Sequence, residues 1–503
     1  MIYVRTLFVK RISFEGVEMT RIQTAVTGRP VAPAGYPRRW LAAIIMIVGA
    51  LMDMIDVTIV NVALPTIRRD LHASATQLEW VVSGYMLAFA AGLIVAGNLG
   101  DRLGRKRIFL LGVAFFGLAS LCAGLSASGT ELIAARVVQG AAAAAMAPQV
   151  LATFRAIFAA GERGKAFGIY GAMLGFASAV GLVLGGVLTD ANLFGWSWRS
   201  VFFINVPVAA CALIAGARVI PETRDPAARR PNLPAAVLLA GSLVAIVYPL
   251  LEGRELGWPA WVWALLAVGV AGVCLLGVRE YRRPSQRVAP LLRPGLFRIP
   301  AFAAGLGIQT AFAAGMQGFF LTFALWLQIG EHFSPLKAGL TSVAFSVGSF
   351  VGAPAAVPLA QRYGRRILAS GAVLMVAGII AVAMMAGHVG ADGSPWPIVP
   401  GLVVAGAGLA LLVVPLVNVV LAAVPVEVAG GASGLFSTAQ QLGGALGVAL
   451  VGTVFFGYLG GGHSFEAALV HAAPYAIGAF ALCAVLSMLL PRTAVADEAL
   501  TGS

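Results

Sequence analysis

Long apolar runs separated by short polar segments make up most of this chain of 503 residues. A helix needs about 20 consecutive apolar residues to cross a lipid bilayer, and fourteen runs reach that length. A segment in lipid must satisfy its own backbone hydrogen bonds, so each run is predicted to be an α-helix. We therefore expect an all-α integral membrane protein whose fourteen transmembrane helices lie at residues 40–64, 78–99, 108–126, 132–154, 166–188, 201–220, 233–251, 260–278, 302–327, 337–360, 367–388, 396–424, 435–458 and 469–490.

The basic residues agree with this count and orient it. Of the 34 Lys and Arg residues, 28 fall in segments that share the side of the amino terminus, seven of them before Trp40. Such an excess is typical of cytoplasmic segments. The pattern predicts a multi-pass membrane protein with both termini in the cytoplasm, and we expect the membrane to be the bacterial plasma (inner) membrane. Membrane topology therefore accounts for the net charge of +13, and no nucleic-acid partner is expected.

A turn rich in glycine and charge occurs twice along the chain. Gly97–Arg107 reads GNLGDRLGRKR after the second apolar run, and Gln361–Arg366 reads QRYGRR after the tenth. The repetition indicates two pseudo-symmetric six-helix bundles with an inserted two-helix hairpin, and internal repeats of this kind are typical of secondary transporters. The predicted divisions are a basic cytoplasmic leader at 1–39, in which Met19 is an alternative start to Met1, an amino-terminal bundle at 40–220, a linker with helices 7 and 8 at 221–300, a carboxy-terminal bundle at 301–490 and a cytoplasmic tail at 491–503.

Two carboxylates and one arginine lie at bilayer depth in the first half. Asp53 and Asp56 fall within the first run, and their spacing of three places them on one face of a helix. A charged side chain at the bilayer centre costs about 2.5–3.5 kcal/mol on insertion scales, so we predict a function for them, namely proton coupling. Arg136 lies inside the fourth run and is expected to pair with one of these carboxylates. Two other interpretations remain: Asp53 only hydrates a cavity, and the ion pair only fixes helix packing.

The second half carries no charge at central depth, and its polar residues there are amides set among aromatic residues. Such a lining suits neutral or monocationic amphiphilic ligands. Aromatic residues at these depths also occur on lipid-facing and core surfaces. The candidate substrate-lining residues are Gln309, Phe312, Gln317, Phe320, Phe323 and Asn418.

Signals for enzymatic chemistry are absent from the sequence. The segment Ala159–Lys165 lacks the first glycine of a nucleotide-binding P-loop. The five histidines are scattered, and the four cysteines fall in four different runs without metal-ligand or redox spacing. We expect no enzyme activity, no metal and no cofactor, with a proton gradient as the source of energy.

Several motifs resemble those of the major facilitator superfamily and of its 14-span drug:proton antiporter branch. Gly97–Arg107 is similar to the loop signature of the superfamily, and Asp56–Pro65 is similar to the first-span signature of the branch. Arg136–Gly140 resembles a fourth-span motif whose arginine is linked to proton transfer. Further similarity to the branch lies in Trp198–Arg199, Phe203–Pro207, Ser334–Leu340 and Gln440–Gly447.

The resemblance implies roles for two further groups of residues. A cytoplasmic gate would comprise Gly97, Asp101, Arg102, Gly104, Arg105 and Lys106. The antiporter motif of the fifth span would comprise Gly181, Gly185 and Gly186. Three positions depart from the usual pattern, since Leu182 follows Gly181 where the branch has proline, position 53 is usually not acidic, and Gln361 replaces the aspartate of the second turn.

These observations favour proton-coupled efflux of lipophilic drugs by alternating access. Export of a lipid, a siderophore or a self-made natural product by the same mechanism is the alternative. A membrane sensor, a membrane enzyme and uptake by symport are weaker interpretations. The expected partners are a small lipophilic substrate, protons, the lipid bilayer and an optional periplasmic adaptor protein.

Overall fold

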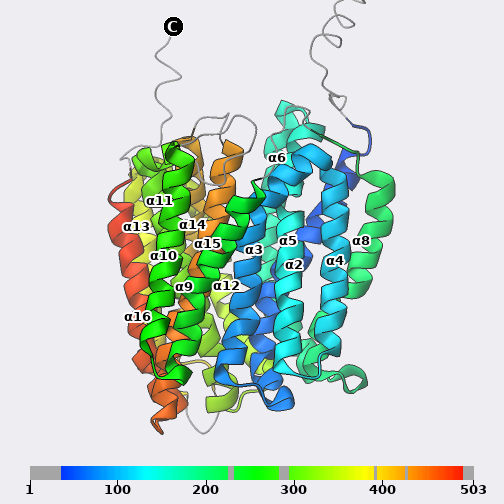
Figure 1. Ribbon diagram of the computed structural model, residues 1–503. Coiled ribbons are helices and arrows are strands. Elements are labelled where there is room, and N and C mark those ends of the chain that lie inside the picture. Colours follow the sequence, from blue (N-terminus) through cyan, green and yellow to red (C-terminus); the bar gives the residue numbers. More distant parts are fainter. Residues whose placement is uncertain (1–35, 225–231, 283–293, 390–393, 425–428, 491–503) are drawn as a thin grey trace, which may run out of the picture.

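The computed structural model describes residues 36–224, 232–282, 294–389, 394–424 and 429–490. Every regular element in these ranges is helical, and Figure 1 shows the long helices running side by side. The long helices are α2 (Arg39–Leu71), α3 (Ala75–Leu103), α4 (Arg105–Leu125), α5 (Gly129–Ile157), α6 (Ala160–Asp190), α8 (Asn205–Val219), α9 (Leu233–Leu256), α10 (Ala260–Arg282), α11 (Pro300–Leu325), α12 (Pro335–Tyr363), α13 (Arg365–Met385), α14 (Val399–Ala422), α15 (Ala429–Gly460) and α16 (Phe465–Ser487). The short elements include α7 (Ser200–Phe203), which precedes α8, and a π-helical turn, η4 (Trp326–Gly330), which extends α11.

Among the described residues, twelve helices are long and apolar enough to cross a membrane. The number becomes thirteen if the two parts of α3, Ala75–Leu93 and Val95–Leu103, form one span bent by 47°. Within α6, the apolar helix found among the described residues is Val180–Asp190, which is too short to be counted as a span. The all-helical membrane fold is confirmed, whereas the count of spans falls short of the fourteen that the apolar runs predict.

The helices form two bundles that meet along a seam (Figure 1). One bundle contains α2 to α8 and the other contains α11 to α16. Across the seam α3 packs on α15, α6 on α12 and α2 on α11. The pair α9 and α10 lies outside both bundles, and α9 contacts α3 on one side of the seam and α15 on the other. The predicted leader 1–39, apart from residues 36–39, and the predicted tail 491–503 lie outside the described residues.

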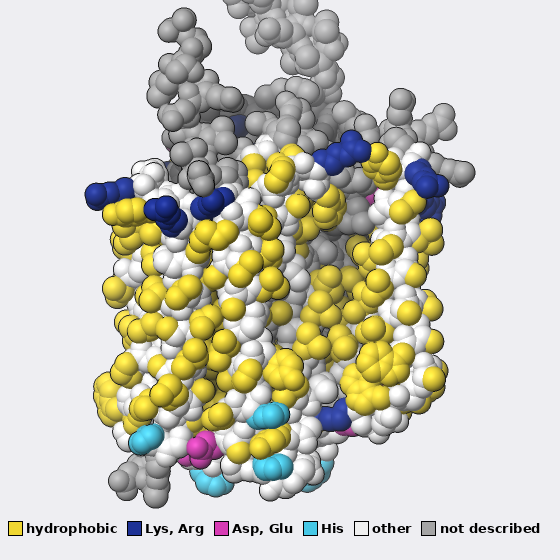
Figure 2. Space-filling view, turned by 90° about the vertical axis from the view of Figure 1, so that its left-hand side faces the viewer, with side chains coloured by type: hydrophobic (Ala, Val, Ile, Leu, Met, Phe, Trp, Pro, Cys, Tyr) yellow, Lys and Arg dark blue, Asp and Glu magenta, His cyan; other side chains and the backbone are white. Residues whose placement is uncertain are grey.

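The two ends of the helices differ in charge. We call the end at which α2 begins and α16 ends the terminal face, and the other end the opposite face (Figure 1). Most Lys and Arg side chains in Figure 2 form a rim near the terminal face, whereas the His side chains lie near the opposite face. Hydrophobic side chains cover the band between them. This distribution is the one expected of a protein that lies in a bilayer.

Four helices that begin at the opposite face have a serine at the N-cap. The hydroxyls of Ser74, Ser128, Ser334 and Ser464 each accept a hydrogen bond from a backbone N–H of the first turn. The backbone N–H of Ser74 also donates a hydrogen bond to the Gln77 side chain, which completes a capping box. Local sequence therefore fixes where these helices start.

The two repeated turns are single glycine links between antiparallel helices. Gly104 joins α3 to α4 with φ of 118°, and Gly364 joins α12 to α13 with φ of 58°. The backbone N–H of Arg105 donates to Thr223 O just after α8, at 3.0 Å. In the same relative place, Nη1 of Arg365 donates to Leu490 O just after α16, at 2.8 Å. The predicted repetition thus places a positive-φ glycine link and an arginine contact to the segment after a later helix in both bundles, although the backbone angles of the two glycines differ.

Candidate functional site

Asp56 lies on α2 at the centre of a buried polar network within the first bundle. Its carboxylate is fully buried and accepts hydrogen bonds from three side chains. Nη1 of Arg136 donates to one oxygen, and Nε2 of Gln139 and Nδ2 of Asn205 donate to the other, each at 2.9 Å. A carboxylate with several donors is stabilised in its charged form, which offsets the cost of its burial.

Arg136 reaches this carboxylate from α5 and is itself held on every side. Its Nη1 also donates to Oε1 of Gln139 at 2.6 Å, and its Nε donates to Val81 O at 3.2 Å. The guanidinium carbon lies 4.2 Å from the centroid of the Tyr85 ring, which places a cation over an aromatic face. The structure thus pairs Arg136 with Asp56 among the two carboxylates that the sequence offered.

Asp53 lies one turn earlier on α2 and has a different partner. The hydroxyl of Tyr85 donates a hydrogen bond to its carboxylate, and the same tyrosine ring stacks against Arg136. Asp53 is half-buried, whereas Asp56 is fully buried. Tyr85 therefore links the two acidic sites, one partly accessible and one enclosed, through a single side chain.

Four of the residues around Asp56 were not singled out individually by sequence reasoning. Ser120 on α4 accepts hydrogen bonds from Gln139 at 2.6 Å and from Asn205 at 3.1 Å. Gln139 and Asn205 belong to the motifs that resemble the superfamily, so a signal for them was present. Ser120 and Tyr85 carried no signal, because a neutral polar residue in an apolar run does not reveal which helix it faces.

The predicted gate residues lie in and around the link between α3 and α4. Asp101 in the last turn of α3 accepts bonds from Nε and Nη2 of Arg105 in the first turn of α4, at 2.9 and 2.7 Å. Arg105 also donates to Ala152 O of α5, at 3.3 Å, and Nζ of Lys106 donates to Ala217 O of α8, at 2.7 Å. Arg102 is exposed. These contacts all lie within the first bundle.

Glu222, which follows α8, contacts the same link between α3 and α4. Its carboxylate accepts a bond from the Lys106 backbone N–H at 3.3 Å and lies 3.5 Å from Nε of Arg107. It also covers Gly104, where an added Cβ would come within 2.4 Å of Oε1. Gly97 packs more loosely, since its Cβ would meet the Pro148 ring at 3.6 Å.

The three glycines predicted on the fifth span are all buried. A Cβ at Gly181 would lie 1.9 Å from Oγ1 of Thr58 on α2, and a Cβ at Gly185 would lie 2.9 Å from the Ile59 side chain. Gly186 faces across the seam instead, where a Cβ would lie 2.6 Å from Cα of Leu336 on α12. These glycines therefore allow α6 to approach α2 on one side and α12 on the other.

The six predicted substrate-lining residues do not form one surface. Gln317 faces the seam, where its Nε2 lies 3.7 Å from Sδ of Met86, and Phe320 is half-buried among other aromatic rings. Three are buried in the second bundle and Asn418 is exposed, so the lining prediction applies best to Gln317 and Phe320. The three buried residues are Gln309, Phe312 and Phe323.

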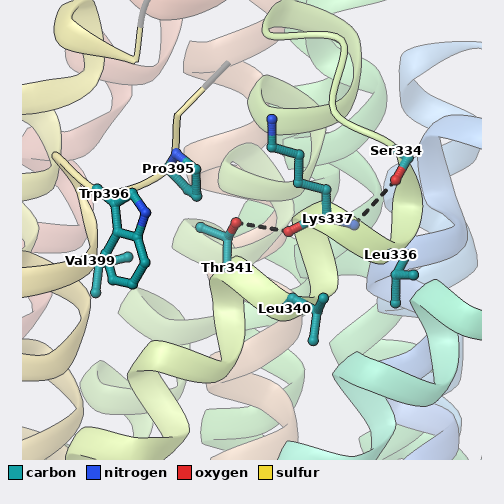
Figure 3. Close-up of a pocket in the computed structure, with 8 residues that line it drawn as sticks. All are labelled: Ser334, Leu336, Lys337, Leu340, Thr341, Pro395, Trp396 and Val399. Atoms are coloured by element: carbon teal, nitrogen blue, oxygen red, sulfur yellow. Dashed lines mark hydrogen bonds between the residues drawn. The ribbon is translucent and has the colours of Figure 1, made fainter. Parts of the chain in front are cut away.

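A pocket of about 380 Å³ opens at the opposite face of the second bundle. It lies between the start of α12 and the segment before α14, and Figure 3 shows Trp396 on one side and Leu336 on the other. The hydroxyl of Thr341 donates to Lys337 O at 2.7 Å there. None of its lining residues belongs to the network around Asp56.

Two helical bundles that meet through glycine contacts, with an ion pair buried at the centre of one of them, define a membrane transporter. The chain belongs to the Major Facilitator Superfamily, because the sequence model of that family matches residues 46–448 and 306–503. This membership confirms the prediction of a transporter and not an enzyme.

Named relatives cover most of the chain. A probable actinorhodin transporter of Streptomyces coelicolor is 38% identical over 86% of this chain and 75% of its own length. A puromycin resistance protein of Streptomyces alboniger is 37% identical over 93% of this chain and 94% of its own. A multidrug resistance protein of Mycobacterium tuberculosis is 34% identical over 82% of this chain and 75% of its own.

Solved structures of the same fold are more distant in sequence. An auto-inhibited peptide transporter of the POT family has a TM-score of 0.63 at 16% identity, covering 89% of this chain and 96% of its own. A D-xylose–proton symporter has a TM-score of 0.62 at 14% identity, covering 90% of this chain and 97% of its own. At these identities the likeness shows the fold alone.

Proposed function

We propose that this protein exports lipophilic, neutral or monocationic drugs in exchange for protons, by alternating access. The observation that carries the proposal is the buried Asp56 network, in which one carboxylate is held by Arg136, Gln139 and Asn205. A proton that neutralises Asp56 removes the negative charge to which these three side chains donate their hydrogen bonds. Breaking one buried ion pair and re-forming it in each cycle couples proton movement to a change of shape.

The similarity to named resistance and efflux proteins supports export over uptake. The puromycin and multidrug resistance proteins among the relatives favour a broad drug exporter. The alternative is a dedicated exporter of a self-made natural product, a lipid or a siderophore. A tetracenomycin C resistance and export protein of Streptomyces glaucescens, 34% identical to this chain, supports that alternative in part.

We further propose that the protein belongs to the 14-span drug:proton antiporter branch, with α9 and α10 as the inserted pair. Each of the fourteen predicted apolar runs overlaps one helix or helix pair of the fold. The basic rim at the terminal face supports the assignment of that face to the cytoplasm of a bacterial plasma membrane. An adaptor partner in the periplasm remains an open prediction.

Efflux of ethidium from energised cells or inverted vesicles tests the proposal directly. The wild type is compared with Asp56→Asn and Asp53→Asn at equal membrane expression. We expect transport to stop when an uncoupler collapses the proton gradient and when Asp56 is replaced. Retention of full, uncoupler-sensitive activity by Asp56→Asn would overturn the coupling role, whereas an inserted wild type that exports no drug would favour the dedicated exporter.

A further inference from the structure

A second group of charged side chains lies where the two bundles and the α9–α10 pair meet. Glu79 on α3 is 0% exposed. It faces α15, because a Cβ at Gly452 would come within 2.4 Å of its Oε1. Nearby, α3 contacts the last turn of α9: Thr76, one turn before Glu79, donates to Glu255, and Nε1 of the adjacent Trp80 donates to Glu252 at 3.0 Å. Three carboxylates therefore gather at this junction.

Glu79 differs from the other two carboxylates because it has no donor. Neither of its oxygens has a hydrogen-bond partner among the described residues. Arg254, which lies beside Glu79 on α9, is the nearby cation, but its Nη2 is 3.7 Å from Glu255 and its guanidinium lies over the Phe456 ring. Nη1 of Arg254 is also buried without a hydrogen-bond partner, so no bond joins the two groups. Burying a charged carboxylate without donors costs several kcal/mol, which favours the neutral acid here.

None of the other charged groups on the helices that pack around α3, Arg68 of α2 among them, forms a hydrogen bond with Glu79. Glu131 of α5 accepts a bond from the Ala127 N–H at 2.8 Å, and Arg69 of α2 pairs with its neighbour Asp70 at 3.3 Å. Arg136 is bound to Asp56. The charged residues of α4 lie at the terminal face, and α15 contains no Asp, Glu, Lys, Arg or His. Arg254, Glu252 and Glu255 are therefore the charged groups nearest to Glu79, and none of them donates a hydrogen bond to it.

A proton is the ligand that suits this place. The described residues include no group of three or more His, Cys, Asp or Glu that could hold a metal ion. Because Glu79 lies on α3 and Gly452 on α15, the enclosure of the carboxylate depends on the two bundles being in contact.

We propose that Glu79 is a second proton-binding residue, protonated while the seam is closed at the opposite face and deprotonated when it opens. Separation of α3 from α15 admits water to the carboxyl group. Glu79 then releases H⁺ to the compartment outside the opposite face, and Glu252 and Glu255 repel the charge that remains. Closure requires that a proton bind again. The proposal rests on the alternating access put forward above, but it does not require that Asp56 carry the transported proton.

A distance measurement across the seam tests this proposal without measuring transport. Spin labels are placed at Thr130→Cys on α5 and Gly460→Cys on α15, both exposed and both at the opposite face. A Cβ at Gly460 meets nothing within 4 Å, so a label is tolerated there. The four native cysteines are replaced by serine. Distances are recorded in nanodiscs from mildly acidic to mildly alkaline pH.

In the wild type, we expect a longer-distance population to grow as the pH rises. Glu79→Gln keeps the shape of the protonated acid, so it should abolish this growth and hold the seam closed throughout. Glu466→Gln, at the start of α16 on the same face but away from the junction, is the matched control and should behave as the wild type does. An unaltered pH response in Glu79→Gln would refute the proposal.

Asp56→Asn separates this proposal from the proposed function. If Asp56→Asn stops drug export but retains the opening that Glu79→Gln removes, two proton sites act independently. If Asp56→Asn removes the pH-dependent opening and Glu79→Gln does not, Asp56 alone senses the proton and the role of Glu79 is refuted. A wild type that exports no drug but opens with pH in a Glu79-dependent way supports the second site and refutes drug efflux.

Discussion

Gly186 is the position at which one methyl group should change the balance between the two states of this transporter. In the present structure, a Cβ at Gly186 would lie 2.6 Å from Cα of Leu336 and 2.7 Å from Pro335 O, which are both backbone atoms of α12. Ordinary contacts of a Cβ begin at 3.4 Å. In the variant Gly186→Ala, α6 and α12 must therefore move apart by most of an ångström while the opposite face is closed.

The magnitude follows from the usual cost of overpacking. Forcing one extra methyl group into a tight contact costs about 1–3 kcal/mol, and 1–3 kcal/mol corresponds to a shift of roughly 5- to 150-fold in an equilibrium. Alanine also favours the helical state of α6 relative to glycine by about 0.5–1 kcal/mol. That gain applies equally to the open and closed forms, so it does not alter their ratio.

The doubly labelled protein described above measures this ratio as well. At fixed pH, Gly186→Ala should enlarge the long-distance population 5-fold or more. Gly339→Ala should do the same, because its Cβ would lie 2.4 Å from Leu182 O across the same contact. Gly478→Ala on α16 is the control, since a Cβ there meets nothing within 4 Å. The reasoning is wrong if both seam variants leave the distance distribution unchanged.

Three further predictions concern single side chains. Arg136→Lys keeps the positive charge but cannot reproduce the several contacts of the guanidinium, so transport should fall at least 10-fold and thermal stability should drop. Unchanged efflux would contradict this. Gly104→Ala, at φ of 118° and against Glu222, should lower the melting temperature. Burial raises the pKa of Glu331, which lies beyond the spanning helix. The ionised Glu331 therefore destabilises the fold once the pH rises above the ordinary pKa of a glutamate. Glu331→Gln should raise the melting temperature at alkaline but not at acidic pH, and equal shifts at both would refute this prediction.

The sequence predicts the ion pair of the site well because charge is rare in lipid. Asp56 and Arg136 stand out in apolar runs, and an isolated charge at bilayer depth needs a partner. The sequence did not indicate whether Asp53 or Asp56 is the partner of Arg136. That choice depends on the rotation of α5 about its axis, which is set by packing along its whole length. Tyr85, which satisfies Asp53, was invisible for the same reason.

Glu79 was passed over because it lies close to the predicted end of a span. The apolar run predicts that the seventh span ends near residue 251, whereas α9 continues to Leu256 and brings Glu252 and Glu255 beside Glu79. A carboxylate near a helix end is ordinarily solvated, so its sequence position alone carries little information. Burial there arises only because three helices from separate parts of the chain converge.

Charged residues at central membrane depth are confined to the first bundle, and this limits how a change of protonation there can affect the second bundle. Asp53, Asp56 and Arg136 all lie in the first bundle, and the second bundle has no charge at central depth. A change of protonation at Asp56 therefore cannot act on the second bundle by attraction to an opposite charge at the same depth. The remaining route is packing: Thr58, two residues after Asp56, touches α6 at Gly181, and α6 touches α12 at Gly186. We infer that α6 carries the signal between the bundles, because the glycine contacts at Gly181 and Gly186 leave no side chain of α6 at these two points to absorb a small shift of α2 before it reaches α12.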